Sequence, residues 1–428
     1  MSKELPQHVP LPAIALAGFD ADLNEEERAA QDAAHRFARD VMRPLGRELD
    51  KLPAEQAFQP GSPFWDFQRE IAQMGFGPDG LIGLEPSQAA RFEGLIVQEL
   101  AWGDAGLATS AGAGGMPMLM AKMSGNQELV DLCEGKLGCW CATQPDRGSD
   151  GLNLYAEERF PGAKGNKGNL QARFVGDEII LNGQSSAWVS NGAVAQVALV
   201  DIVADYGDGY WDSEGNTFGC NAIVPLDIKG VSKGKPLEKL GKRPLPQGEI
   251  YFDEVRIPRR FAIATRDDYE FKHAQTWAHA GTNLNHLAAG LARAGFELAL
   301  AYVNDRKQGG AILADLQLTQ FRIGGIGMKV EAIKAMARHV ALYTKCSSLP
   351  HPYFTASGKA FCNTEMLNVM RECMTLFGGN GLTREYPIEK LLRDAQAQQI
   401  EDGENNLLQM HYGFLLSRLH RETEFGHA

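Results

Sequence analysis

The chain has 428 residues, of which 44% are apolar and 22% charged, so its composition is that of a globular protein. The formal net charge of -12 argues against nucleic-acid binding, because phosphate contacts need a basic surface. No run of 18 apolar residues occurs, which excludes a membrane-spanning helix. The first residues lack the apolar core of a signal peptide, and an odd number of cysteines, seven, is typical of reduced thiols. We therefore expect a cytoplasmic protein without a disulfide framework.

Residues 24 to about 135 are predicted to be helical. Asn24 is a suitable N-cap, three glutamates follow it, and apolar residues then recur every four positions as far as Val41. Pro44 is expected to end this first helix. Amphipathic patterns predict two more helices over 64–75 and 90–104, and the segment after them is rich in methionine and small residues, which favours close helix packing.

The rest of the chain divides into a β-rich part and a second helical part. From residue 138, β-branched stretches alternate with turn glycines and an Asn-Gly pair at 182–183, which predicts strands. Long periodic stretches then predict four helices of 20 or more residues in an antiparallel bundle. The predicted fold is α+β, with an N-terminal helical domain over 1–137, a β-barrel-like domain over 138–262 and a C-terminal four-helix bundle over 263–428.

Three glycine-bearing segments offer candidate binding residues. Residues 139–151 place hydroxyls and backbone N–H groups in one turn, and the SSAWVSN segment combines an indole with a hydroxyl that can donate to a ring system. The third segment, 376–406, joins a glycine-rich turn to three crowded carboxylates. For each segment an ordinary structural role remains open: a polar turn, a core tryptophan or a solvated acidic loop.

Several other kinds of site are excluded by their motifs. The sequence has no G-x-x-x-x-G-K-[ST] phosphate loop and no strand that leads into a Rossmann fingerprint. Cys139 and Cys141 form a C-x-C pair, and no second pair of ligands lies at zinc spacing. We therefore expect no metal site.

Taken together, the segments resemble the acyl-CoA dehydrogenase family over nearly the whole chain. ATQPDRGSD resembles the family's flavin- and substrate-binding loop T-E-P-x-x-G-S-D, with Gln144 in place of the glutamate, and AWVSN is similar to the flavin-stacking W-I-T-N strand. KLGKRPLPQGEIYFDEVRIP, DRKQGGAILADLQ and FGGNGLTREYPIEKLLRDA resemble three later family motifs in the family's order. Five motifs in one order indicate membership.

The resemblance implies an enzyme that dehydrogenates an acyl-CoA thioester at Cα and Cβ. FAD would be the cofactor, an electron-transfer flavoprotein the acceptor, and the assembly a homodimer or homotetramer. Some relatives with an Asp-Gly pair at the base position act on cyclic acyl-CoAs, so a cyclic or branched acyl group is also indicated. Two alternatives remain open: a flavin oxidase similar to nitroalkane oxidase that uses O₂, and an inactive flavin-binding relative with a regulatory role.

The resemblance also assigns the residues that bind the flavin. It places three of them against the isoalloxazine and one at the substrate or pyrophosphate end: Thr143, Trp188 and Ser190, and then Ser149. Arg306, Gln317 and Gly379 are expected to contact the pyrophosphate and adenosine of FAD. Arg306 and Gln317 are expected to do so from a neighbouring subunit. Glu404 stands where the family has a threonine that touches the flavin.

The family's usual base is the glutamate of I-Y-E-G-T, and the matching stretch here reads I-E-D-G-E. The resemblance therefore implies that Asp402 is the base, with Glu404 as the alternative, while Glu401 replaces the tyrosine. Some relatives carry the base on an early helix of the bundle, where this chain offers Asn283 and no carboxylate. If none of the loop carboxylates is the base, His286 is the next candidate.

Other departures from the family pattern surround the acyl pocket. Leu284 stands where many relatives have an arginine close to the base. Gly309 replaces a phenylalanine, and Thr375 replaces a glutamine that contacts the flavin. We therefore expect an intact family frame with an altered acyl pocket.

Overall fold

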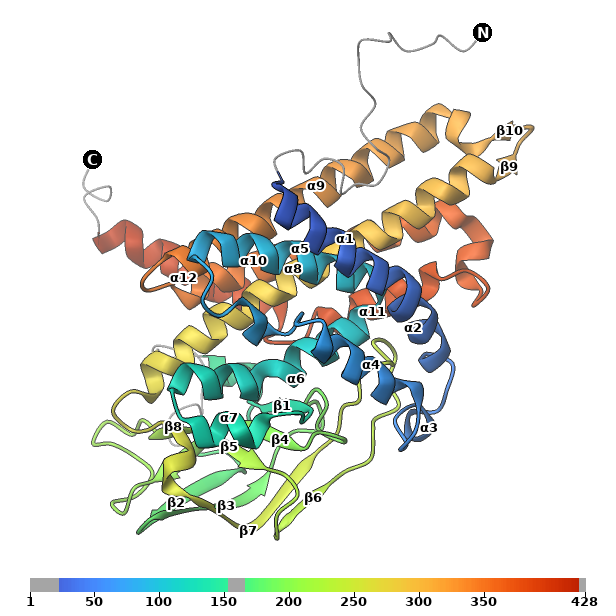
Figure 1. The fold of residues 1–428 in the computed structure, drawn as a ribbon. Helices are drawn as coiled ribbons and strands as arrows, with labels where there is room; N and C mark the ends of the chain where they lie inside the picture. Colours follow the sequence, from blue (N-terminus) through green and yellow to red (C-terminus); the bar gives the residue numbers. More distant parts are fainter. Residues whose placement is uncertain (1–22, 153–165, 423–428) are drawn as a thin grey trace.

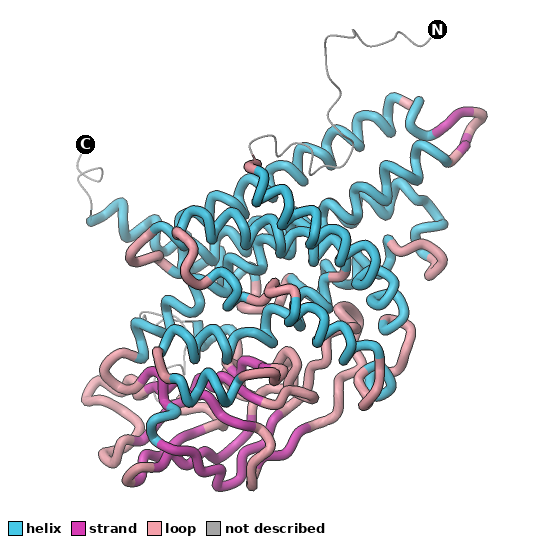
Figure 2. The backbone as a smooth tube through the Cα atoms, in the orientation of Figure 1, coloured by secondary structure: helices cyan, strands magenta, loops and turns pink. Residues whose placement is uncertain are grey.

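The computed structural model describes residues 23–152 and 166–422, which form helices at both ends of the chain and a sheet between them (Figure 1). The strands gather at one side of the molecule and the long helices at the other (Figure 2). This arrangement confirms the predicted α+β fold with helical terminal regions. Within the described ranges, no helix combines the length and the apolarity needed to cross a bilayer.

The first helix begins as its sequence predicts but does not end there. In α1 (Glu25–Phe37), Asn24 and Glu27 form a capping box, which satisfies two N–H groups of the first turn. The expected end at Pro44 is wrong, because a π-turn (Ala38–Met42) leads directly into α2 (Arg43–Leu49). The wider turn changes the hydrogen-bond register just before the proline, so Pro44 occupies the first turn of α2, where its missing N–H costs little.

The remaining helices of the N-terminal region lead toward the sheet. Asp104 separates the two longest of them and caps the second, since its side chain accepts from Leu107 N at 2.9 Å. Methionines of this second helix pack partly against the core of the sheet. The elements are α3 (Ala54–Ala57), α4 (Pro63–Gln73), the 3₁₀ turn η3 (Pro78–Leu81), α5 (Pro86–Gly103), α6 (Ala105–Ser124) and α7 (Gln127–Cys133).

The central sheet has eight strands and remains open. Seven of them follow the order β6-β7-β3-β2-β4-β5-β8, and β1 pairs in parallel with β4. Because β6 and β8 end this order without pairing to each other, the expected barrel is not closed. The strands are β1 (Gly138–Cys141), β2 (Gln171–Val175), β3 (Glu178–Gln184), β4 (Val197–Asp205), β5 (Gly219–Pro225), β6 (Val231–Lys233), β7 (Ile250–Pro258) and β8 (Ala262–Ala264).

The Asn-Gly pair at 182–183 does not form the expected turn. It lies within β3, where the pairing with β7 shifts register between Leu181 and Gly183. Gly183 has φ +115°, and a Cβ there would lie 2.2 Å from the carbonyl oxygen of Asn169. The glycine is therefore needed for a bulge and a close backbone approach, which the dipeptide alone does not distinguish from a hairpin turn.

The C-terminal region contains three helices of 20 or more residues and a fourth, α12, of 18, so the fourth is shorter than predicted. Helix α8 starts beside the sheet and ends at the β9–β10 ribbon, which projects beyond the other helices (Figure 1). A shorter helix, α11, lies between the third and fourth long helices. The elements are α8 (Tyr269–Asp305), β9 (Lys307–Gln308), β10 (Ala311–Ile312), α9 (Gln317–Cys346), α10 (Pro352–Phe377), α11 (Ile388–Gln398) and α12 (Asn405–Glu422), with short 3₁₀ turns at Ser149–Leu152 (η4), Arg259–Phe261 (η5), Leu313–Asp315 (η6) and Gly378–Leu382 (η7).

Two large cores hold most of these elements together, and a small third cluster of Leu152, Ala360 and Leu408 packs α12 against α10. One joins side chains of the N-terminal helices with those of α8 to α11, so both ends of the chain share it. The other lies between the sheet and helices α6 and α7. The two helical regions therefore share one core and do not form separate packing units. The division into 1–137, 138–262 and 263–428 describes the order of the regions along the chain and remains a proposal.

Candidate active site

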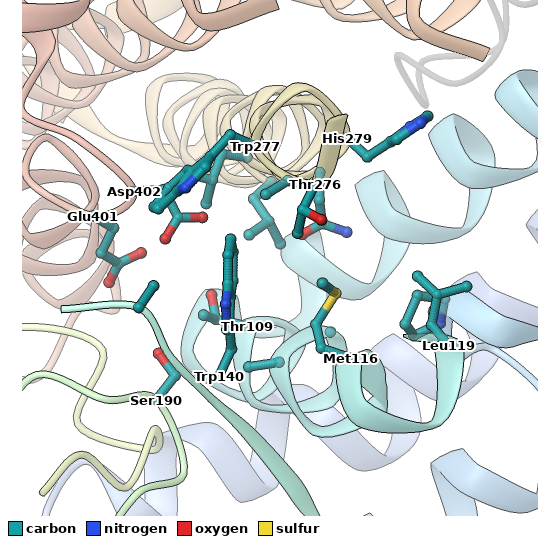
Figure 3. Close-up of a pocket in the computed structure, with 18 of the residues that line it drawn as sticks. Thr109, Met116, Leu119, Trp140, Ser190, Thr276, Trp277, His279, Glu401 and Asp402 are labelled. Atoms are coloured by element: carbon teal, nitrogen blue, oxygen red, sulfur yellow. The ribbon is translucent and has the colours of Figure 1, made fainter. Parts of the chain in front are cut away.

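A large cavity lies where the two helical regions meet the sheet. Its volume is about 1220 Å³, and its walls come from α5, α6, α8, the start of the sheet and the loop between α11 and α12. In Figure 3 the carboxylates of Glu401 and Asp402 lie at one end, and Leu119 and His279 lie at the opposite end. Most of the wall between these ends is apolar, including Ile96, Leu100, Met116, Leu119, Met120 and Leu287.

Two indole rings form one wall of the cavity near Asp402 (Figure 3). Trp140 and Trp277 have ring centroids 4.8 Å apart at an angle of 44°. Hydrogen bonds to buried groups fix both rings: Trp140 Nε1 donates to Asp201 at 2.7 Å, and Trp277 Nε1 donates to His273 Nε2 at 3.2 Å. Because His273 Nδ1 lies 3.4 Å from the same Asp201, the two indoles belong to one network and keep their orientation.

The segment expected to hold the flavin ring lines the same cavity. The hydroxyls of Thr143 and Ser186 lie 2.6 Å apart, and Thr143, Trp188 and Ser190 all contribute to the wall. The Trp188 side chain is 61% exposed, which leaves a large flat apolar surface available for a stacked ring. The gathering of an exposed indole and two hydroxyls at the cavity mouth fits an isoalloxazine.

Ser149 also lines the cavity and links two distant segments. Its hydroxyl accepts from Glu404 N at 3.2 Å, so it ties the turn after β1 to the loop before α12. Gln144, which replaces the family's glutamate, is buried, and its side-chain oxygen accepts from Leu170 N at 2.7 Å. Its amide therefore holds the turn in place through a backbone contact.

The loop between α11 and α12 presents Asp402 to the cavity. Asp402 has φ +47°, a left-handed conformation that is uncommon for a residue with a Cβ, and Gly403 follows at φ +99°. This φ favours glycine, and a Cβ on Gly403 would also lie 2.6 Å from Leu152 Cδ1. Lys359 anchors the turn from α10, since its buried Nζ donates to Gly403 O at 2.6 Å and to Asn405 Oδ1 at 2.8 Å.

The surroundings of Asp402 make it a weaker acid than usual. The residue is exposed to the cavity, while protein atoms surround it at longer range. This burial, together with the charge of Glu401, raises the pKa of Asp402 to about 6, although Lys359 and Lys242 act in the opposite direction. A carboxylate with this pKa is suited to take a proton near neutral pH.

The two neighbouring carboxylates are held in different ways. Glu401 lines the cavity, and one of its oxygens accepts a hydrogen bond from the buried Nζ of Lys242. Glu404 instead caps α12, since its Oε2 accepts from Asn406 N at 3.0 Å and from Leu407 N at 3.2 Å. Its carboxylate is therefore engaged at the start of a helix, while those of Asp402 and Glu401 face the cavity.

Other residues singled out from the sequence lie away from the cavity. Arg306, Gln317 and Gly379 are exposed and do not line it. This position is compatible with the expectation that Arg306 and Gln317 serve a neighbouring subunit. Gly309 and Thr375 are exposed as well.

The early bundle helix α8 contributes to the wall without offering a base. Asn283 and Leu284 line the cavity. His286 is fully buried and does not, and its Nδ1 lies 3.2 Å from Gln98 Nε2. Burial lowers the pKa of His286 to about 4. Asp402 is thus better placed than His286 to act as a base.

Known proteins are similar to this chain in both sequence and fold. Residues 278–413 match the family model described as acyl-CoA dehydrogenase, C-terminal domain. The chain is 27% identical over 321 residues to the probable acyl-CoA dehydrogenase FadE25 of Mycobacterium tuberculosis, with 73% of this chain and 77% of that protein covered. It is 26% identical over 380 residues to the probable acyl-CoA dehydrogenase YngJ of Bacillus subtilis, covering 84% and 94%. The solved glutaryl-CoA dehydrogenase from Mycobacterium smegmatis aligns with a TM-score of 0.76 and 24% identity over 94% of this chain and 97% of its own.

The protein has the acyl-CoA dehydrogenase fold. Helices form both ends of the chain, an open sheet lies between them, and a cavity lies where they meet. The sequence comparisons agree with this fold: residues 278–413 match the acyl-CoA dehydrogenase C-terminal domain, and the chain is similar to acyl-CoA dehydrogenases over most of its length. The resemblance predicted from the motifs is confirmed. The relatives that it resembles are named as dehydrogenases, and a structure of one of them is a complex with FADH₂.

Several residues of the site are not singled out by the sequence. Lys242 and Lys359 are buried beside the base loop, although isolated lysines usually indicate solvent-facing positions. Their signal is weak: Lys359 stands between small and apolar residues in a helix, and Lys242 lies within the KLGKR segment. Trp140 and Trp277 come from distant segments, so their pairing depends on tertiary structure alone.

Proposed function

We propose that the protein removes hydrogen from Cα and Cβ of an acyl-CoA thioester to give a 2-enoyl-CoA, with Asp402 as the base that takes the α-proton. The observation that carries this proposal is the position of Asp402: its carboxylate faces the cavity, with a raised pKa of about 6, in the wall that also contains the expected flavin-binding residues. Neither neighbouring carboxylate combines these properties, since Glu401 is paired with Lys242 and Glu404 caps a helix.

The residues at the cavity mouth fit FAD. Thr143 and Ser190 would donate to the polar edge of the isoalloxazine and Trp188 would stack against it. When bound there, FAD supplies the acceptor for the hydride that leaves Cβ. A structure of the Mycobacterium smegmatis relative is a complex with FADH₂, which supports this assignment. The exposed residues Arg306 and Gln317 would reach the FAD of a second subunit in a homodimer or homotetramer.

Asp402 has two parts to play in the proton transfer. Its carboxylate would take the α-proton, and an acyl chain that covers it would raise its pKa further by removing the remaining water. Its backbone N–H would donate to the thioester oxygen, where negative charge develops as the proton leaves. Lys359 and Gly403 hold the backbone of this loop, and in the proposal they keep both groups in place for the substrate.

An acyl group that contains a ring fits this cavity well. An aspartate is one methylene shorter than the family's usual glutamate, about 1.3 Å of reach. The substrate must therefore come closer to the loop. The paired faces of Trp140 and Trp277 stand beside Asp402 and offer a flat apolar wall, against which a ring packs more completely than a flexible chain. We extend the proposal to cyclic or branched acyl groups on this basis.

The electron acceptor in the proposal is an electron-transfer flavoprotein in the cytoplasm. The family assignment favours a dehydrogenase over a nitroalkane oxidase or an inactive relative. The retained carboxylate at the cavity also argues against loss of activity.

The test is the bleaching of bound flavin without oxygen. Purified protein is mixed with straight, branched and cyclic acyl-CoAs and, separately, with nitroethane. We expect the absorbance of oxidised flavin to fall with at least one acyl-CoA. Asp402→Asn should bind the same acyl-CoA but reduce the flavin about 10² to 10⁴ times more slowly, the usual effect of losing a general base. Asp402→Glu should retain part of the rate.

Two results would contradict the proposal. Reduction by nitroethane with rapid peroxide formation, and none by any acyl-CoA, would identify an oxidase. Equal rates for the wild type and Asp402→Asn would place the base elsewhere.

A further inference from the structure

Glu401 has a carboxylate oxygen beside the base to which no described residue donates. Its side chain is 17% exposed and lines the cavity (Figure 3). The buried Lys242 Nζ donates to Oε2, and no hydrogen bond from the described residues reaches Oε1. A carboxylate oxygen in a mainly apolar cavity loses its contact with water when a ligand enters, which is costly unless the ligand supplies a donor.

Lys242 holds this carboxylate in a fixed orientation. The lysine side chain has 0% exposure, and its backbone is left-handed with φ +46°. The backbone N–H of Lys242 donates to Asp394 Oδ1 at 2.5 Å, and its Nζ donates to Thr109 Oγ1 at 3.0 Å. Hydrogen bonds therefore hold both the backbone and the tip of the lysine side chain. The Thr109 hydroxyl in turn donates to Ala105 O at 2.8 Å. With Lys242 and Thr109 engaged in these contacts, Glu401 Oε1 is the acceptor that this cluster leaves for a ligand.

We propose that Glu401 selects an acyl group that carries a hydroxyl, which donates to Oε1 while Asp402 takes the α-proton. The inference rests on the proposed function, because it assigns the hydroxyl to the acyl part of an acyl-CoA. Glu401 and Asp402 are adjacent in sequence and their carboxylates lie at the same end of the cavity, so the hydroxyl belongs on the acyl chain or ring near the reacting carbons (Figure 3).

The charges around the loop favour a neutral donor over charged groups. An acyl group with a carboxylate would bring a third negative charge to Glu401 and Asp402. An acyl group with an ammonium would enter a region that already contains the buried lysines Lys242 and Lys359 and the cavity-lining Lys239. A plain alkyl group would bury Oε1 without a partner. A hydroxyl avoids all three costs.

The experiment compares acyl-CoAs that differ by one functional group. Flavin reduction is measured without oxygen for cyclohexanecarbonyl-CoA, for its derivatives with a hydroxyl at ring positions three and four, and for the corresponding ketones. The panel also contains a straight-chain pair, hexanoyl-CoA and 5-hydroxypentanoyl-CoA, in which only the second carries a hydroxyl. Glutaryl-CoA is the probe that carries a carboxylate. The wild type should prefer one hydroxylated member over its unsubstituted partner by about 10- to 100-fold in the rate constant of flavin reduction divided by the substrate dissociation constant, the effect of one hydrogen bond to a charged group.

Substitution of Glu401 should change the order of substrates. In Glu401→Gln the amide oxygen would still accept from Lys242, and the NH₂ would then face the cavity as a donor. The hydroxyl preference should fall below about threefold and the ketone should gain. Glu401→Tyr, with the residue found in the family pattern, should also lose the hydroxyl preference. Because each ratio compares two substrates on one variant, an altered Asp402 affects both alike. Glu128→Gln, in an exposed ion pair with Arg260, should keep the wild-type ratio.

Three outcomes decide the matter. Loss of the hydroxyl preference in both Glu401 variants supports the inference. Efficient oxidation of acyl-CoAs with no hydroxyl preference in the wild type, or an unchanged preference in both variants, overturns it and leaves the dehydrogenase proposal standing. Failure of every acyl-CoA to reduce the flavin overturns the proposed function and, with it, the inference.

Discussion

Asp402 is controlled by a small set of charged neighbours. Burial and the carboxylate of Glu401 favour its neutral form, whereas Lys359 and Lys242 favour its ionised form. Burial prevails, so the pKa rises from the ordinary value to about 6. Only the ionised form can accept the α-proton, and the balance among these four residues therefore decides the pH at which the site becomes active.

The pH profile should show this balance directly. We expect kcat/KM to be constant above a midpoint near pH 6 and to fall about tenfold per pH unit below it, because the proton then occupies the base. Glu401→Gln should move the midpoint to lower pH, since it removes a negative charge that raises the pKa of Asp402. Lys359→Gln should move it to higher pH for the opposite reason. A midpoint that neither variant moves would show that another group titrates.

Helix α11 connects three parts of the molecule through buried charges. Lys390 Nζ donates at 2.7 Å both to Asp104, the cap of α6, and to Asp394 on its own helix. Burial raises the pKa of Asp104 despite the lysine, and the two carboxylates raise the pKa of Lys390. Asp394 also accepts from Lys242 N, so the helix positions the segment that supports Glu401.

Removing the lysine should destabilise the fold strongly. Lys390→Met would leave two buried carboxylates without a cation, which typically costs about 3 to 5 kcal/mol of unfolding free energy. Urea denaturation followed by circular dichroism gives this value. Lys329→Met breaks a half-exposed pair with Glu372 and should cost under about 1 kcal/mol. Similar losses in both variants would show that the buried triad adds nothing.

The sequence predicts elements whose signal is local. The long C-terminal helices follow from apolar periodicity, and the start of α1 follows from Asn24 and Glu27, because caps and helix faces involve residues a few positions apart. The passage through Pro44 is not predicted, since the π-turn that accommodates it has no simple sequence pattern.

Some features of the site also follow from local sequence, whereas others depend on tertiary packing. The alignment of I-E-D-G-E with a family motif points to Asp402, but the left-handed backbone and the choice of neighbours do not follow from it. Lys242 and Lys359 look like surface residues in the sequence, and only tertiary packing turns them into buried partners of the loop. The motif alignment therefore predicts that Asp402 is the residue that faces the substrate. The pKa of Asp402, in contrast, depends on contacts between distant segments.

At the scale of the whole molecule, α9 presents an unusual surface. Leu318, Phe321 and Met328 are 65%, 79% and 73% exposed, close in sequence to Gln317. Apolar side chains grouped in this way commonly mark a contact between proteins. With the expected role of Arg306 and Gln317 toward a neighbouring subunit, this surface supports a homo-oligomer in which FAD lies near the contact.

Disruption of that contact should release both subunits and cofactor. Arg306→Ala should weaken flavin retention, and Phe321→Glu should shift the protein toward monomers, because a carboxylate would be buried in an apolar contact. Light scattering after gel filtration gives the mass, and the visible spectrum gives the bound FAD. Val175→Glu, at an exposed apolar position on β2, is the matched control. A folded, colourless wild-type monomer that ignores added FAD would contradict the assembly and the cofactor site together.

The ion pair between Asp104 and Lys390 also affects how the protein is made. Its two partners are 286 residues apart, so at ordinary synthesis rates Lys390 follows Asp104 by roughly 15 to 60 s. During that interval α8 to α11, which later share the core of the N-terminal helices, are still being synthesised. An apolar surface is then open to solvent on the ribosome. Folding of the nascent chain therefore depends on protection of its first helices until the last part of the chain emerges.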